Sequence, residues 1–201
     1  MNTFETSWLR AWAQLGLEPL PGLYHDVLVA YQQPQRHYHT LQHLRECLLL
    51  FASVSHGFAH PGEVELALWF HDAVYDVQAQ DNERRSADWA VQVLAQAGAA
   101  DDVQRRVEAL VMATCHDTAP TTPDQQGLVD IDLAILGAPP GRFAEYDQQV
   151  RAEYAWVPEP VYASNRRQVL SAFLARASIY RTPGFQEQFE AQARRNLKSL
   201  V

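Results

Sequence analysis

Cysteine is scarce in this chain of 201 residues, which contains only Cys47 and Cys115. Two cysteines so far apart exclude a scaffold held together by disulfides, and the apolar residues around both predict buried free thiols. The chain also lacks any apolar run long enough to span a bilayer. Its first residues carry neither the basic region nor the apolar core of a signal peptide. We therefore expect a cytoplasmic, reducing location and no membrane association.

A basic excess is also missing, since the formal net charge is −8. Binding to a nucleic acid polymer needs a basic face, so none is expected. A small phosphorylated ligand is not excluded, because one local arginine cluster is enough to bind it. No repeat or low-complexity linker divides the chain. A hydrophobic content of 47% over this length predicts a single domain, residues 1–201, with a full core.

The spacing of apolar residues is helical throughout, and no segment alternates as a strand would. The sequence therefore predicts an all-α fold of six to nine helices, with loops at 75–81 and 118–127. Residues 37–137 carry the motifs described below, and the helices after residue 142 are expected to pack on that core. The expected helices cover residues 3–15, 23–31, 36–54, 63–72, 83–97, 101–114, 142–154, 161–177 and 184–197.

An apolar helix ends in an adjacent acid and base, His71 and Asp72, where it is expected to pass through the core. Burying such a pair destabilises the fold unless the two are paired or bind a metal. Three other positions offer similar groups: His39 at a helix start, the second pair His116-Asp117, and Asp132 within an apolar segment. These are nitrogen and oxygen ligands without a thiolate, which argues against a structural zinc site.

Imidazole and carboxylate ligands suit Mn, Fe, Co, Ni, Zn or Mg, one or two per chain, held with open positions for water. Such a metal lowers the pKa of bound water and neutralises charge on a phosphoryl group. Some of these residues have simpler explanations. His116 would meet the C-terminal dipole of its helix favourably. Asp132 could cap a helix, and Asp130 could be the ligand in its place.

The ordered set His39-Thr40-Leu41, His71-Asp72 and Asp132 resembles the HD superfamily of metal-dependent phosphohydrolases, in particular its small single-domain members. The resemblance implies a helical metal site with His39, His71, Asp72 and Asp132 as ligands. Asp72 would bridge two metals if a second is bound. His116, and after it His43, would then complete the second site.

The activity implied by this resemblance is hydrolysis of a small phosphorylated or nucleotide-like substrate by metal-activated water. Two alternatives remain open. One is a sensor module that binds a metal or nucleotide without catalysis. The other is a di-iron oxygenase on the same fold, which would use His116 and His43. A homo-oligomer is compatible with all three.

One departure from the family concerns the proton carrier. Several branches have a Glu or Lys three residues after the Asp of the pair, and this chain has Tyr75. Asp76, Glu83 and Asp117 therefore all remain candidates for the general base. The Gly-Tyr-Pro signature of the branch that degrades cyclic dinucleotides is absent. With Asp72, the predicted catalytic residues are Glu83 and Asp117.

Three residues are predicted to bind substrate: His43, Arg84 and Arg151. Each has a simpler reading. His43 could be a buried histidine bonded to a backbone carbonyl. Arg84 lies in a charged helix entry, where solvated ion pairs are common. Arg151, with Arg166 and Arg167, could bind phosphate through its planar fork, or could form salt bridges on a helix surface.

Overall fold

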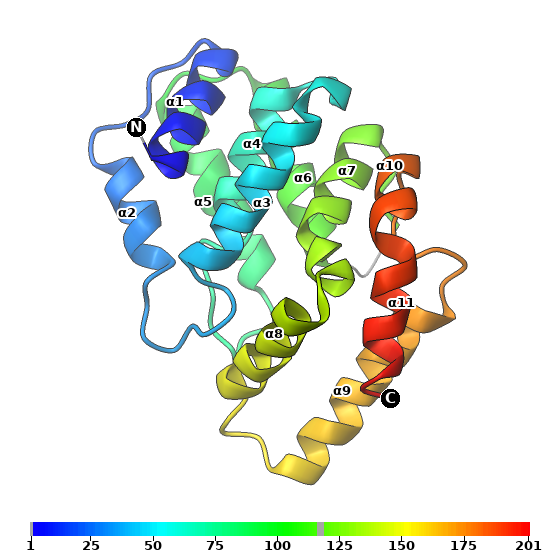
Figure 1. The fold of residues 1–201 in the computed structure, drawn as a ribbon. Coiled ribbons are helices and arrows are strands. Elements are labelled where there is room, and N and C mark those ends of the chain that lie inside the picture. The colour runs from blue at the N-terminus through cyan, green and yellow to red at the C-terminus, as the bar shows by residue number, and fades with distance from the viewer. Residues whose placement is uncertain (1, 116–118) are drawn as a thin grey trace. The chain divides into compact units, whose positions relative to one another are not determined.

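The computed structural model describes residues 2–115 and 119–201, and every regular element in that part of the chain is a helix (Figure 1). This confirms the all-α prediction. The α-helices are α1 (Thr3–Leu15), α2 (Leu23–Ala30), α3 (Leu41–Val54), α4 (Pro61–Phe70), α5 (Asn82–Gln96), α6 (Asp101–Met112), α7 (Pro123–Asp132), α8 (Pro140–Glu153), α9 (Glu159–Ala175), α10 (Pro183–Phe185) and α11 (Ala191–Lys198). The 3-10 helices are η1 (Ser55–Gly57), η2 (Ala113–Cys115) and η3 (Leu133–Gly137), and η4 (Gln186–Glu190) is a π-helix.

The chain forms two compact units, Met1–Leu128 and Val129–Val201, and the boundary falls within α7. The first unit contains α1 to α6, and the second contains α8 to α11. The prediction of one domain over the whole chain stays a prediction. Among the described residues, no helix is both long enough and apolar enough to cross a membrane.

Helix α4 passes through the core of the first unit. All its residues from Gly62 to Phe70 are buried, so it has no solvent-exposed face. It lies against α1, where Gly62 allows close contact, since a Cβ on this residue would stand 2.7 Å from the Cβ of Gln14. The buried Glu65 carboxylate accepts a hydrogen bond from Ser7 at 2.6 Å and pairs with Arg10. This partnership compensates the burial of a charge.

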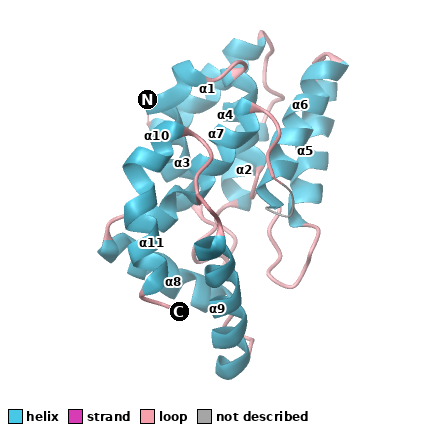
Figure 2. Ribbon diagram, turned by 90° about the vertical axis from the view of Figure 1, so that its right-hand side faces the viewer, coloured by secondary structure: helices cyan, strands magenta, loops and turns pink. Residues whose placement is uncertain are grey.

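The helices α5 and α6 form an antiparallel pair in the first unit, visible side by side in Figure 2. Gly98 in the connection has a φ of 82°, a conformation that glycine adopts without strain. Arg106 of α6 donates two hydrogen bonds of 2.7 Å to Glu63, which is buried in α4. This bidentate ion pair connects α6 with α4.

Two expected boundaries were wrong. Helix α3 begins at Leu41, not near Arg36, because Thr40 is extended and its hydroxyl accepts a hydrogen bond from the Gln42 amide at 3.2 Å. His39 therefore precedes the helix. Helix α7 begins at Pro123, inside the segment predicted as a loop. Proline is favourable in a first helical turn, and this one starts the helix early.

Buried polar side chains organise the second unit. Asp130 accepts hydrogen bonds of 2.7 Å from the backbone amides of Arg181 and Thr182 and from the Thr182 hydroxyl. Tyr180 donates to the Leu133 carbonyl at 3.1 Å. The Asn196 amide donates to two carbonyls of the segment that includes η3. These bonds attach the C-terminal helices to η3 within this unit.

Candidate metal site

Two histidines and one aspartate converge in the first unit. The Nε2 atoms of His43 and His71 are 3.1 Å apart. The Asp72 Oδ2 atom lies 3.0 Å from the His71 Nε2 and 3.4 Å from the His43 Nε2. Helix α3 supplies His43, and the residues after α4 supply the adjacent pair. Both imidazoles are buried.

The second nitrogen of each ring has its own hydrogen bond. The Nδ1 atom of His71 is 2.8 Å from the Leu68 carbonyl, so it carries the proton and donates. The Nδ1 atom of His43 is 3.0 Å from the Tyr38 hydroxyl. Metal-binding histidines usually have such a second bond, which fixes the ring and leaves the other nitrogen for the metal.

The separations fit a shared metal ion. A metal bonded at about 2.0–2.1 Å to nitrogen and oxygen holds neighbouring ligand atoms about 2.9–3.4 Å apart, from right-angled to tetrahedral geometry. The three distances among His43, His71 and Asp72 lie between 3.0 and 3.4 Å. These residues could therefore hold one ion without rearranging.

Cys47 adds a thiol to this group. It is buried one turn after His43, and its sulfur lies 3.8 Å from both ring nitrogens of that histidine. Ligand atoms of Cys47, His43 and His71 lie within 4.8 Å of one another, so they form a buried group that could bind a metal. The prediction of a buried thiol is confirmed for this residue and wrong for Cys115, which is only partly buried. The sequence analysis did not place Cys47 near the metal, although its spacing of four from His43 in a helix would have indicated proximity.

Electrostatics favour the ionised form of Asp72. Burial raises the pKa of its carboxyl, but the charges of His71 and His39 and hydrogen bonds from His43 and His71 outweigh that effect. The pKa of Asp72 consequently lies well below its usual value. An ionised carboxylate is the form that binds a cation.

Arg36 anchors the backbone around these residues. Its buried guanidinium donates to the carbonyls of His39 at 3.0 Å, Asp72 at 2.6 Å and Ala73 at 3.0 Å. It also lies over the rings of Tyr31 and Tyr75. The sequence analysis missed this role, because a buried arginine that binds carbonyls leaves no local pattern.

His39 lies beside the cluster, with its ring centroid 6.0 Å from that of His43. It stacks on Tyr75 at 4.3 Å between centroids. Tyr75, three residues after Asp72, therefore supports the His39 ring. The predicted role of His39 as a ligand stays a prediction.

Two acidic residues in α7 differ in their surroundings. The carboxylate of Asp130 is occupied by the three donors described above, so the alternative that it binds the metal finds no support. Burial raises its pKa, although the bonds from Arg181 and Thr182 oppose that effect. Asp132 ends α7 with helical dihedral angles, and its side chain does not cap η3. Its role as a ligand stays a prediction.

The other predicted residues lie in different surroundings. Arg84 pairs with Glu108 at 2.5 Å and with Asp88 at 3.5 Å, which is the surface ion pair considered as its simpler reading. Glu83 lies in the first turn of α5 and is partly exposed.

In the second unit, Arg151 pairs with Glu159 at 2.8 Å and lies over the ring of Tyr162. These contacts agree with the helix-surface salt bridge considered for it. His116 and Asp117 lie outside the described residues, so the part that His116 would play in a di-iron centre stays a prediction.

No family model, curated protein or solved structure matches this chain. The described residues thus define an all-helical protein with a buried group of histidine, cysteine and aspartate side chains that could bind a metal ion. Membership of the HD superfamily stays a prediction from the sequence motifs.

Proposed function

We propose that this protein is a metal-dependent phosphohydrolase of the HD type, acting on a small phosphorylated substrate. The convergence of His43 Nε2, His71 Nε2 and Asp72 Oδ2 within 3.4 Å carries this proposal. The hydrogen bonds on both Nδ1 atoms support it, because they orient the free nitrogens toward one point.

In this proposal His43, His71 and Asp72 hold the metal, and Cys47 lies within reach of it. When bound, the metal supplies an activated water and neutralises charge on the phosphoryl group. Asp72 keeps its negative charge at neutral pH, and Arg36 fixes the backbone that carries it. His39 and Asp132 are proposed as further ligands from the sequence motif. The general base is proposed among Asp76, Glu83 and Asp117, as the sequence analysis left it.

The test has two stages. Protein stripped with a chelator is reconstituted separately with Mn, Fe, Co, Ni, Zn and Mg, and bound metal is counted. Each form is then assayed for phosphate release from nucleotides and simple phosphoesters. We expect Asp72→Asn and His71→Ala to lose both metal and activity. Asp88→Asn changes an exposed acid on α5 and should retain both.

Two results would contradict the proposal. An empty site after reconstitution would exclude a metal enzyme of any kind. Bound metal with no phosphate release from any substrate would favour the sensor alternative. The position of Tyr75, stacked on His39 where a proton carrier is common in the family, is the observation that favours that alternative.

A further inference from the structure

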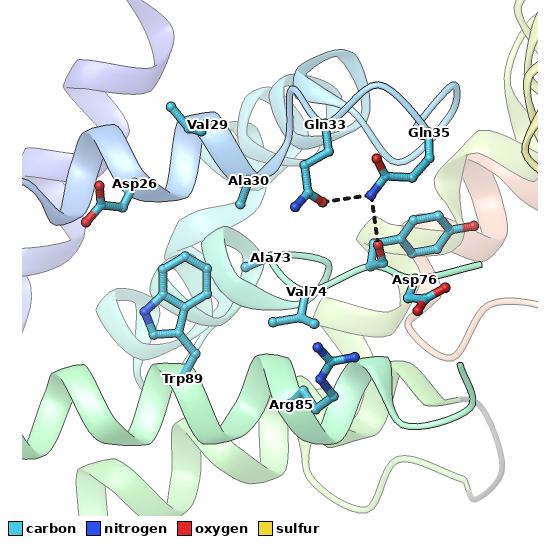
Figure 3. Close-up of a pocket in the computed structure, with 11 residues that line it drawn as sticks. Asp26, Val29, Ala30, Gln33, Gln35, Ala73, Val74, Asp76, Arg85 and Trp89 are labelled. Carbon is cyan, nitrogen blue, oxygen red and sulfur yellow. Dashed lines mark hydrogen bonds between the residues drawn. The ribbon is translucent and has the colours of Figure 1, made fainter. Parts of the chain in front are cut away.

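An open pocket of about 600 Å³ lies between α2 and α5 in the first unit (Figure 3). Its volume is in the range that small-molecule sites occupy. Ala73 and Val74 lie between the two helices, and Ala30 comes from α2. None of the predicted metal ligands lines it, although Tyr75, which stacks on His39, is among its lining residues.

One polar group in the pocket is the amide of Gln33. Its oxygen accepts hydrogen bonds from Gln35 at 3.1 Å and from Arg36 at 3.3 Å. Because both donors contact the same atom, that atom is the Gln33 oxygen, and the amide nitrogen turns toward the pocket (Figure 3). Gln33 therefore presents a donor to a ligand.

A second donor is the guanidinium of Arg85, which reaches the pocket from α5. Arg85 forms a long ion pair of 3.9 Å with Asp81, and about half of the Arg85 side chain is exposed. Such a weak surface pair contributes little. The planar fork of Arg85 is thus available for a carboxylate or phosphate.

One helical turn after Arg85, Trp89 forms an apolar wall. Its indole packs edge-on against Phe70 at 5.5 Å between centroids, which holds the ring in place. An indole beside the small side chains of Ala30, Ala73 and Val74 suits a flat ring, because aromatic faces stack with little loss of freedom.

Carboxylates limit the charge that the pocket accepts. Asp26 and Asp76 lie toward its two ends, with Arg85 between them (Figure 3). A ligand with several acidic groups would meet repulsion there, whereas a single acidic group can reach Arg85 alone.

We propose that this pocket binds a small flat aromatic molecule that bears one acidic group. Its ring would lie against Trp89, its acid would bind Arg85, and an acceptor on the molecule would take the hydrogen bond from Gln33. A nucleoside monophosphate and an aromatic carboxylate share this chemistry. Binding does not require the metal.

Calorimetric titration of the metal-free protein tests this inference. The probes are adenosine 5′-monophosphate and 2-aminobenzoate, with adenosine as the probe that lacks an acid. We expect one acidic probe to bind with one site per chain. Arg85→Gln and Trp89→Leu should each weaken binding by about tenfold or more, the loss expected for one charge-assisted pair or one stacked ring. Arg105→Gln changes an exposed arginine on α6 and should leave binding unchanged.

Several results would overturn the inference: no binding of either acidic probe, equal binding of adenosine and its monophosphate, or unchanged binding by both pocket variants. The thermal unfolding of each variant is measured alongside, and Arg85→Lys gives a second test because it keeps the charge and loses the fork. Asp72→Asn should bind the probe normally, so the outcome is separate from that of the proposed hydrolase.

Discussion

Arg36 holds Asp72 through its backbone, with 2.6 Å between a guanidinium nitrogen and the Asp72 carbonyl oxygen. The same nitrogen donates to the His39 carbonyl at 3.0 Å. Two residues predicted as ligands, separated in the chain by α3, η1 and α4, are thus connected by one buried side chain. Their relative position depends on Arg36 rather than on either local segment.

Replacing Arg36 with alanine should lower the free energy of unfolding by about 2–4 kcal/mol, because three buried or partly buried carbonyls lose their donor. The free energy of unfolding of Arg36→Lys should lie between those of the unmodified protein and Arg36→Ala, because an ammonium cannot reproduce the planar fork of arginine. Urea unfolding measures both, with the exposed Arg105→Ala as the control. Equal stability of Arg36→Ala and the control would show that these bonds contribute nothing.

The Tyr38 hydroxyl should matter for metal binding. When a metal occupies the His43 Nε2, the ring proton lies on Nδ1 and donates to the Tyr38 oxygen. Tyr38→Phe should therefore weaken metal binding by about tenfold with the fold intact. Competition with a chromophoric chelator measures the affinity. Tyr24→Phe removes a hydroxyl distant from the histidines and should have no effect, and a similar loss in both variants would contradict the prediction.

Cys47 should influence which metal is preferred. A thiolate favours zinc over harder ions such as manganese. Cys47→Ser should weaken zinc binding by about tenfold and leave manganese binding nearly unchanged. Cys115→Ser is the matched control. If Cys47→Ser leaves zinc affinity as in the unmodified protein, the sulfur is only a neighbour of His43.

The helices were largely predictable, because apolar spacing and turn residues determine most of them. The bounds of α1 agree with the prediction at both ends. The start of α3 was missed, since capping by Thr40 competed with a continuous helical pattern. The start of α7 was missed because the segment before and around Gly127 is rich in proline, threonine and glutamine, which suggested a loop. Tertiary contact explains that glycine: a Cβ on Gly127 would stand 2.5 Å from the Phe58 ring.

This contact can be tested with two glycines that both lie in helices. Gly127→Ala should destabilise the protein by about 1–3 kcal/mol, because the overlap with Phe58 exceeds the gain in helix propensity. Gly141→Ala in α8 meets nothing within 4 Å and should stabilise by up to about 1 kcal/mol. Denaturant unfolding measures both, and changes of the same sign would contradict this account.

The site was predictable only in part. The adjacent pair His71-Asp72 stood out as polar residues at the end of an apolar helix. The sequence alone does not determine whether His39 or His43 turns toward that pair. The choice depends on where α3 begins and on the Tyr38 hydrogen bond. The roles predicted for Glu83 and Arg84 rested on their closeness in sequence to the His71-Asp72 pair, and that of Arg151 on the ability of arginine to bind phosphate. Neighbouring helices determine where such side chains point.

Tyr180 should make stability depend on alkaline pH. Burial raises the pKa of its hydroxyl well above the ordinary value of 10.0, so the folded protein resists its ionisation. The contribution of Tyr180 is complete below pH 10 and is lost as the pH rises further. Tyr180→Phe should cost about 1 kcal/mol at pH 8, where the Leu133 carbonyl loses its donor. That difference should shrink at pH 11, and an equal difference at both pH values would contradict the prediction.

The burial of α4 on all sides has a consequence for backbone amide exchange. Its amides are shielded along the whole helix, and the His71 amide is bonded to the Ala67 carbonyl at 2.9 Å. Amides in such a segment exchange with solvent deuterium only when the surrounding structure opens globally. The backbone that carries His71 is therefore ordered before any ion arrives, and ion capture requires little loss of chain entropy.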